Sequence, residues 1–190
     1  MLRNAMIWIC GLNTTLDSDW CGIRPMLLQL AAKVGADLIG ATWDGQGMSW
    51  LAGDTLTVVK SSKSYDTIVA GGHSHGAWRL YDMLRYQDPD AVAAAGFLDI
   101  CPPYEPTAWL TRTFDRPKAA SKALCIYQRN DIPLAGVLMT ADPQTTQINA
   151  TPWGLHHATL PSDSRVQDRL SLLMLEAFTS AAHAQMGASS

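Results

Sequence analysis

The sequence is poor in charge. Asp, Glu, Lys and Arg make up 16% of its 190 residues, against about 25% in an average soluble protein, and the formal net charge is −3. No block of basic residues occurs anywhere in the chain. A nucleic-acid groove or a patch for anionic membranes needs such a block, so we expect neither kind of partner.

Long apolar runs are also missing. No stretch approaches the roughly 20 apolar residues that cross a bilayer, so we expect no membrane span. Residues 1–4 (MLRN) begin no long apolar stretch with a small-residue cleavage site, as a signal peptide would. We therefore expect a cytoplasmic protein.

Cysteine pairs of the C-x-x-C type do not occur. The cysteines Cys10, Cys21, Cys101 and Cys125 lie far apart in the chain. In a chain of this length without a secretory signal, this spacing predicts reduced, packed side chains rather than a disulfide framework or a catalytic thiol.

No internal repeat or low-complexity segment occurs; short apolar runs alternate with helix-like stretches instead. This alternation predicts a single α/β domain over residues 1–190, a doubly wound and mostly parallel sheet flanked by helices, with residues 183–190 as a frayed tail. The expected strands are 5–10, 37–43, 65–70, 95–100, 123–127 and 147–150. The expected helices begin near Pro25, near Ala77 and at a cap formed by Ser162.

Two segments are harder to assign. Residues 48–64 should hold a crossover, but their β-branched middle is equally compatible with a strand. Residues 101–121 contain four prolines and no periodicity, and so long a loop in a compact domain is typical of a lid or a binding wall.

Residues 72–76 read G-H-S-H-G, a G-x-S-x-G motif between an apolar strand and an apolar-striped helix. A sharp strand-to-helix turn requires glycine on either side, because bulkier side chains would collide with neighbouring elements. The turn presents the Ser74 hydroxyl at the carboxyl edge of the sheet, beside a helix N-terminus. We therefore predict that Ser74 is a nucleophile.

A serine nucleophile needs a base. His73 and His75 flank the serine, where side chains usually point away from its hydroxyl, whereas His156 and His157 follow the last strand. We favour His157 as the base, because it leads directly into the capped final helix.

A carboxylate must orient that imidazole. Asp99 ends one apolar run, and Asp131 follows the next one within a polar segment. An aspartate at the end of a buried strand is costly without a partner, which favours Asp99 and leaves Asp131 as the alternative.

The oxyanion of the tetrahedral intermediate needs two backbone donors. One is expected to be the amide of His75, after the nucleophile. The other should come from the loop after the first strand, from Leu12 or Asn13, where Gly11 permits a close approach.

Several tryptophans fall in or beside loops at the same predicted edge: Trp43, Trp50, Trp109 and Trp153. Large aromatic side chains often fill cores, but here they could line a pocket for an acyl or aromatic group. Trp109 and Trp153 are the candidate substrate-binding residues.

The order Ser74, Asp99 or Asp131, His157 resembles that of the α/β-hydrolase superfamily, over nearly the whole chain. The segments 127–128 (YQ), 133–136 (PLAG) and 157–161 (HATLP) are similar to small bacterial lipase/esterase-like serine hydrolases. The resemblance implies acyl transfer from a small-molecule acyl substrate through a covalent serine ester, with no metal or organic cofactor. It also implies a minimal fold without a cap domain, a shallow site, and loss of the first strands of the larger sheet.

Two other interpretations are compatible with the sequence. The same scaffold could serve as a non-catalytic binding module, because a fold does not fix a function. A metal-assisted hydrolase could use His73, His75 and His157, although no carboxylate-rich spacing favours it.

Overall fold

The computed structural model describes residues 3–12, 19–43, 65–102, 113–131 and 136–188. Its centre is a six-stranded sheet in which every neighbouring pair is parallel, in the order β2-β1-β3-β4-β6-β8. The strands are β1 (Asn4–Leu12), β2 (Ala36–Trp43), β3 (Thr67–His73), β4 (Ala94–Leu98), β6 (Ala123–Tyr127) and β8 (Thr145–Asn149). Every expected strand is therefore present, with shifts of a few residues at most ends.

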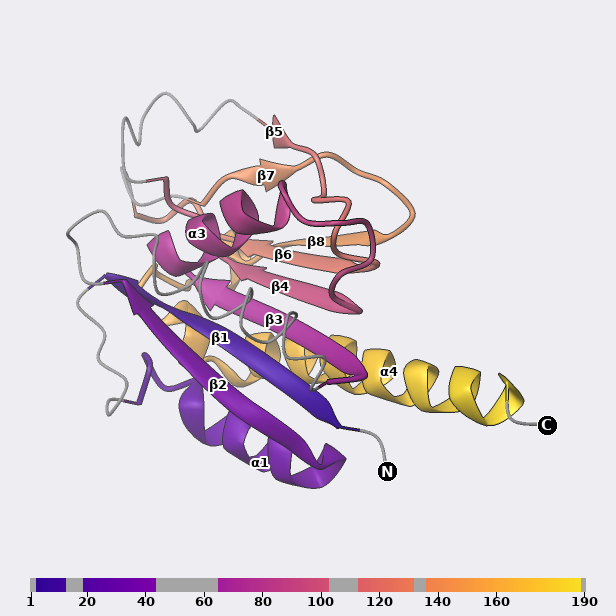
Figure 1. Cartoon of the computed structure of the whole chain (residues 1–190). Helices are drawn as coiled ribbons and strands as arrows, with labels where there is room; N and C mark the ends of the chain where they lie inside the picture. The colour runs from indigo at the N-terminus through magenta and orange to yellow at the C-terminus, as the bar shows by residue number, and fades with distance from the viewer. Residues whose placement is uncertain (1–2, 13–18, 44–64, 103–112, 132–135, 189–190) are drawn as a thin grey trace.

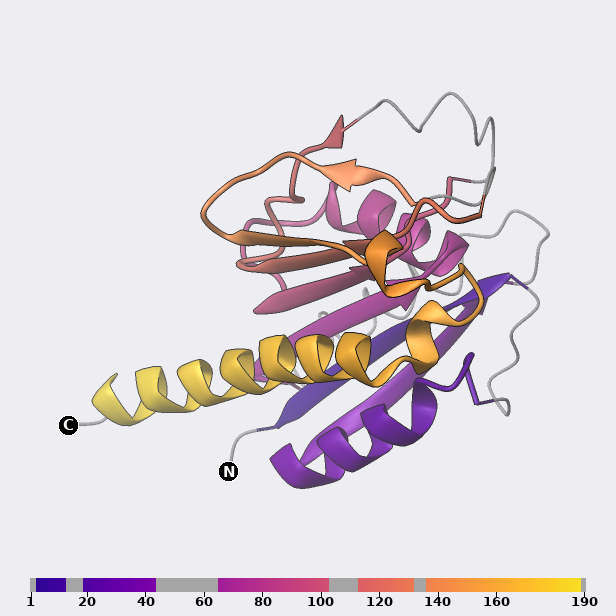
Figure 2. The same ribbon diagram turned by 180° about the vertical axis from the view of Figure 1, so that it is seen from behind.

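Helices cover both faces of this sheet. Helix α3 (His75–Leu84) packs on one face, and α1 (Arg24–Val34) and α4 (Ser164–Ala188) pack on the other, as the two opposite views in Figures 1 and 2 show. A separate pair of short parallel strands is formed by β5 (Thr113–Phe114) and β7 (Leu138–Met139). The doubly wound α/β fold predicted from the sequence is confirmed.

The apolar runs follow from this layering. In β1, Ile7 and Ile9 join the core beneath α3, whereas Met6 and Trp8 join the core beneath α1 and α4. All four side chains are fully buried. Because both faces of a doubly covered sheet are buried, successive residues are apolar instead of alternating with polar ones.

Helix α1 has the ends that its sequence predicts. Pro25 occupies the first turn, where its missing N–H is not needed, and Gly35 ends the helix with a left-handed φ of 63° and an N–H bonded to the carbonyl of Ala31.

The start and end of α4 differ from the prediction. Ser162 is not its cap: it lies in a 3-10 turn (Leu160–Ser162), and its hydroxyl donates to the carbonyl of Thr159 at 2.9 Å. The carboxylate of Asp163 instead accepts the N–H of Arg165, two residues later, at 2.9 Å. The sequence offers two capping residue types side by side, and the 3-10 turn decides between them. The helix also continues to Ala188, through most of the segment expected to fray.

The strand order places a topological switch at the centre of the sheet. The chain passes from β1 to β2 on one side and later returns to β3 on the other side of β1. In open α/β sheets, ligands bind beyond the carboxyl ends of the strands at such a point. Residues 48–64 lie outside the described part of the chain, as do residues 103–112 of the proline-rich loop. No described helix is both long enough and apolar enough to cross a bilayer.

Candidate active site

Ser74 occupies a strained turn between β3 and α3. Its φ of 59° and ψ of −129° lie in a region that residues other than glycine seldom adopt. A Cβ on Gly72 would lie 2.9 Å from the backbone nitrogen of Ala77, and one on Gly76 would overlap the carbonyl oxygen of Ile9. Both glycines are therefore required by close packing of backbone on backbone, as the motif predicts.

Three side chains from distant parts of the sequence form one hydrogen-bonded chain. Nε2 of His157 lies 2.8 Å from Oγ of Ser74, and Nδ1 of His157 lies 2.6 Å from Oδ2 of Asp99. An ionised carboxylate only accepts hydrogen bonds, so Nδ1 carries the proton and Nε2 is left to accept from the serine hydroxyl. The three residues favoured from the sequence are thus brought together in a geometry suited to proton transfer.

Asp99 directly follows β4 and is fully buried. Its φ of 48° turns the chain at the end of the strand. The backbone N–H of Gln128 donates to Oδ1 at 3.1 Å, and the side-chain amide of the same residue donates to Oδ2 at 2.9 Å. Together with the proton of His157, these donors satisfy a carboxylate that would otherwise be costly to bury.

Asp131, the alternative acid, also contacts His157, but its carboxylate binds the main chain of His157 and not the imidazole. Oδ2 of Asp131 accepts the backbone N–H of His157 at 2.6 Å, and Oδ1 lies 2.7 Å from Nδ1 of His156. Two hydrogen bonds hold the pKa of Asp131 below its usual value of 3.8: chiefly that from His156, and also that from the His157 N–H. The imidazole of His156 is therefore directed to this carboxylate.

His73 has a contact that sequence reasoning missed. Its Nε2 lies 2.9 Å from the carbonyl oxygen of His157, and the two rings are 4.7 Å apart between centroids. Burial, reinforced by His157, lowers the pKa of His73 to about 3, so the ring is neutral at pH 7 and Nε2–H donates to the carbonyl. The only sequence signal was the position of this histidine beside Ser74, which indicated no partner.

His75 does not point away from the serine, contrary to expectation. Its Nδ1 lies 3.4 Å from Oγ of Ser74. Burial and the proximity of His157 lower the pKa of His75, which favours a neutral ring. His75 is the first residue of α3 and directly follows Ser74. Its ring therefore starts from the same turn as the serine hydroxyl and lies close to it.

The structure describes part of the expected oxyanion site. A Cβ on Gly11 would lie 3.2 Å from Cβ of Ser74, so the end of β1 passes directly beside the candidate nucleophile. Leu12 is the last residue of β1 and is paired with Trp43, and the His75 amide lies in the first turn of α3. Asn13 lies outside the described residues, and the donor roles remain predictions.

Of the two candidate substrate-binding tryptophans, the structure describes only Trp153. Trp109 lies outside the described residues. Trp153 is half-buried in a 3-10 turn (Thr151–Trp153), packs against the core under α1 and α4, and has the guanidinium of Arg165 4.8 Å from its ring centroid. Its described contacts are those of a packed aromatic side chain.

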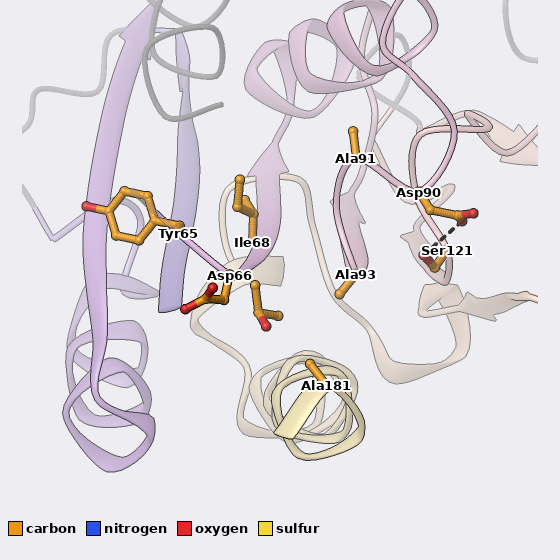
Figure 3. Close-up of a pocket in the computed structure, with 9 residues that line it drawn as sticks. Tyr65, Asp66, Ile68, Asp90, Ala91, Ala93, Ser121 and Ala181 are labelled. Atoms are coloured by element: carbon orange, nitrogen blue, oxygen red, sulfur yellow. Dashed lines mark hydrogen bonds between the residues drawn. The ribbon is translucent and has the colours of Figure 1, made fainter. Parts of the chain in front are cut away.

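A cavity of about 330 Å³ lies at the opposite edge of the sheet. Figure 3 shows it near the start of β3, between Ile68 and Ala93 on one side and Ala181 of α4 on the other, with Asp90 and Ser121 bonded to each other at 2.9 Å on its rim. Because these residues surround the amino ends of the strands, the cavity is separate from the candidate active site.

The three buried cysteines do not compete with Ser74, and the described residues form no metal cluster. Burial raises the pKa of Cys10 to about 12, of Cys101 to about 11 and of Cys125 to about 12, so these thiols are poor nucleophiles at neutral pH. Among the described residues, no group of three or more His, Cys, Asp or Glu side chains could hold a metal ion.

Comparison with known proteins identifies the fold. No protein-family model and no curated protein sequence matches the chain. Est1E from Butyrivibrio proteoclasticus is similar over 94% of this chain and 89% of its own, with a TM-score of 0.59 and 13% sequence identity. The esterase Pf2001 of Pyrococcus furiosus is similar over 92% of this chain and 83% of its own, with a TM-score of 0.60 and 12% identity.

A third solved structure carries the fold name itself. It is a protein of unknown function from Agrobacterium tumefaciens, suggested to be an α/β hydrolase. It covers 92% of this chain and 86% of its own length, with a TM-score of 0.59 and 14% identity. Identities this low speak for the arrangement of strands and helices only. The chain has the fold of the α/β-hydrolase superfamily, as its motifs implied.

Proposed function

We propose that the protein is a serine hydrolase that cleaves a carboxylic ester or thioester through a Ser74–His157–Asp99 acyl-enzyme mechanism. The observation that carries this proposal is the unbroken hydrogen-bonded chain from Ser74 Oγ through His157 to Asp99, at 2.8 Å and 2.6 Å. Similarity to solved structures that include a named esterase supports the same class of reaction.

The chemistry follows from where the protons lie. Nε2 of His157 takes the proton of Ser74 Oγ as the oxygen attacks the acyl carbon, and the resulting imidazolium is stabilised by Asp99. The imidazolium then protonates the leaving alcohol or thiol, and the acyl group remains on Ser74. A water molecule activated by His157 releases the acid and restores the serine. No metal or cofactor takes part in these reaction steps.

Two features favour attack by Ser74 in particular. Its hydroxyl stands at the N-terminus of α3, where helix N–H groups attract the negative charge that develops on the substrate oxygen. We assign the two oxyanion donors to the amide of His75 and to an amide from Leu12 or Asn13, at the end of β1 beside Ser74.

The test is hydrolysis of p-nitrophenyl esters and acyl thioesters of increasing chain length. We expect Ser74→Ala to lower kcat by at least about 10³-fold with no loss of folding. Ser121→Ala, which alters a serine at the opposite edge of the sheet, is the matched control and should keep wild-type activity. A folded wild-type protein that cleaves none of these substrates would favour the non-catalytic binding module instead.

A further inference from the structure

We propose that Asp131 and His73 are positioning residues that hold the main chain of His157 from both sides and thereby aim its imidazole at Ser74. This inference rests on the proposed function. It assigns to Asp131 a role different from that of the triad acid, and gives a role to a histidine that the mechanism does not use.

His157 needs such support because of where it lies. It begins a turn after β8, outside every strand and helix, so its peptide groups have no partners in a strand ladder or helix. Asp131 accepts its N–H at 2.6 Å, and His73 lies 2.9 Å from its carbonyl oxygen. Both polar groups of one loop residue are thus bonded to side chains from two other places in the chain, the loop after β6 and the end of β3.

The anchoring groups are themselves held. The side-chain carbonyl of Gln128 accepts the backbone N–H of Asp131 at 2.9 Å, and the amide of the same side chain donates to Asp99. His73 is 5% exposed and belongs to β3, next to Ser74. The positions of the nucleophile, the acid and the histidine main chain are therefore linked through hydrogen-bonded side chains, of which Gln128 and His73 are buried.

The precision needed explains the effect on catalysis. The imidazole of His157 lies 2.8 Å from Ser74 Oγ and 2.6 Å from Asp99 Oδ2, and proton transfer over these hydrogen bonds tolerates little displacement of the ring. A misplacement of about 1 Å can lower the rate about 100-fold. Releasing the His157 peptide would let the ring pivot about its backbone while Asp99 and Ser74 stayed in place. This predicts a loss in kcat with little change in KM.

Neither oxygen of Asp131 is bonded to the His157 ring. One binds the His157 N–H and the other faces Nδ1 of His156, whereas Nδ1 of His157 is bonded to Asp99. Asp131 thus contributes a hydrogen-bond acceptor at a fixed position, and not a negative charge beside the imidazole of His157. Asn preserves such an acceptor and Ala removes it, which makes the proposal testable.

The experiment compares Asp131→Ala, Asp131→Asn and a matched control, Asp142→Ala. Asp142 also accepts a backbone N–H, that of Gln144 at 2.7 Å, and its side chain is 30% exposed against 31% for Asp131. It lies in the turn before β8, at the opposite edge of the sheet. We expect Asp131→Ala to lower kcat by about 10–100-fold with KM within about 2-fold, Asp131→Asn to recover most of the loss, and Asp142→Ala to leave kcat unchanged.

A second readout does not depend on turnover. The proton between His157 Nδ1 and Asp99 should give a far-downfield NMR signal in the wild type, assigned by its absence from Asp99→Asn. We expect this signal to persist in Asp131→Asn and to broaden or disappear in Asp131→Ala. His73→Gln, which can still donate to the carbonyl, should keep it, whereas His73→Ala should weaken it.

The outcomes separate the two proposals. Wild-type kcat and an unchanged downfield signal in folded Asp131→Ala would overturn the positioning role while leaving the hydrolase proposal intact. Equal damage from Asn and Ala would show that the charge matters and not the acceptor, which also contradicts the proposal. If the wild type cleaves neither the esters nor the thioesters, but the downfield signal is present in the wild type and lost in Asp131→Ala, the positioning role is supported and the hydrolase proposal is refuted.

Discussion

Asp99 and Asp131 both follow a strand at the carboxyl edge of the sheet and both hydrogen-bond to His157. Asp99 is fully buried and meets the imidazole, whereas Asp131 is partly exposed and meets the backbone N–H of the same residue. Two carboxylates that are both candidates for the acid in the sequence therefore contact different atoms of one histidine.

Strand order explains the division. Asp99 follows β4, which pairs with β3, the strand that directly precedes Ser74. Asp131 follows β6, one strand further away, at a spacing of about 4.8 Å per strand. Asp99 also comes directly after the last residue of its strand, whereas Asp131 lies four residues beyond Tyr127, in the loop. The nearer carboxylate reaches the ring, and the more distant one reaches the main chain.

The largest expected effect distinguishes the two carboxylates directly. Asp99→Asn should lower kcat by about 10³–10⁴-fold, because an amide cannot fix the tautomer or stabilise the imidazolium. Asp131→Asn should cost less than about 10-fold, because its oxygen still accepts the main-chain N–H. Steady-state kinetics with one short-chain ester measures both. A larger loss from Asp131→Asn than from Asp99→Asn would reverse their assigned roles.

A smaller effect is expected from crowding Asp99 alone. A Cβ on Gly136 would overlap Oδ1 of Asp99, so Gly136→Ala should displace that carboxylate and lower kcat by about 10–100-fold. The free energy of unfolding should fall by about 1–3 kcal/mol, as for an overpacked core. Urea unfolding and ester kinetics measure the two effects. Gly187→Ala, where a Cβ would meet nothing within 4 Å, is the control and should change neither.

A further prediction concerns the pH dependence of stability. The folded pKa of His73, about 3, lies below its unfolded value of 6.5, so unfolding takes up a proton and stability falls as the pH drops from 6.5 towards 3. The pKa of Asp131 is also lowered, but from 3.8, so its contribution is lost only below about pH 4. Urea unfolding between pH 7 and 3 measures both.

The slope of the free energy of unfolding against pH should fall by up to about 1.4 kcal/mol per pH unit in His73→Gln, between pH 6 and 4. In Asp131→Asn the slope over the same pH range should not change. The pH ranges assigned to the two residues would be contradicted if, at pH 5 to 6, this slope became flatter in Asp131→Asn and stayed unchanged in His73→Gln.

The fold was largely predictable because burial on both faces of a parallel sheet leaves apolar runs bounded by glycine and proline. The places of Ser74 and Asp99 were predictable for a related reason: each directly follows a strand, and the strand fixes where the residue lies. His157 was favoured for its position between the last strand and the last helix.

The supporting contacts were not predictable, because they join side chains to peptide groups in loops. Neither the acceptor role of Asp131 nor the donors of Gln128 and His73 leaves a periodic signal in the sequence. The cap of α4 shows the same limit on a smaller scale, because a single 3-10 turn moves the cap from Ser162 to Asp163.

The most direct test of the account is covalent labelling with a fluorophosphonate, followed by peptide mapping by mass spectrometry. A single phosphonyl adduct on Ser74 is expected in the wild type and in Asp131→Asn, with much slower labelling of Asp99→Asn and none of Ser74→Ala. An adduct on another residue, or labelling of Ser74→Ala at the wild-type rate, would contradict the assignment of Ser74 as the nucleophile.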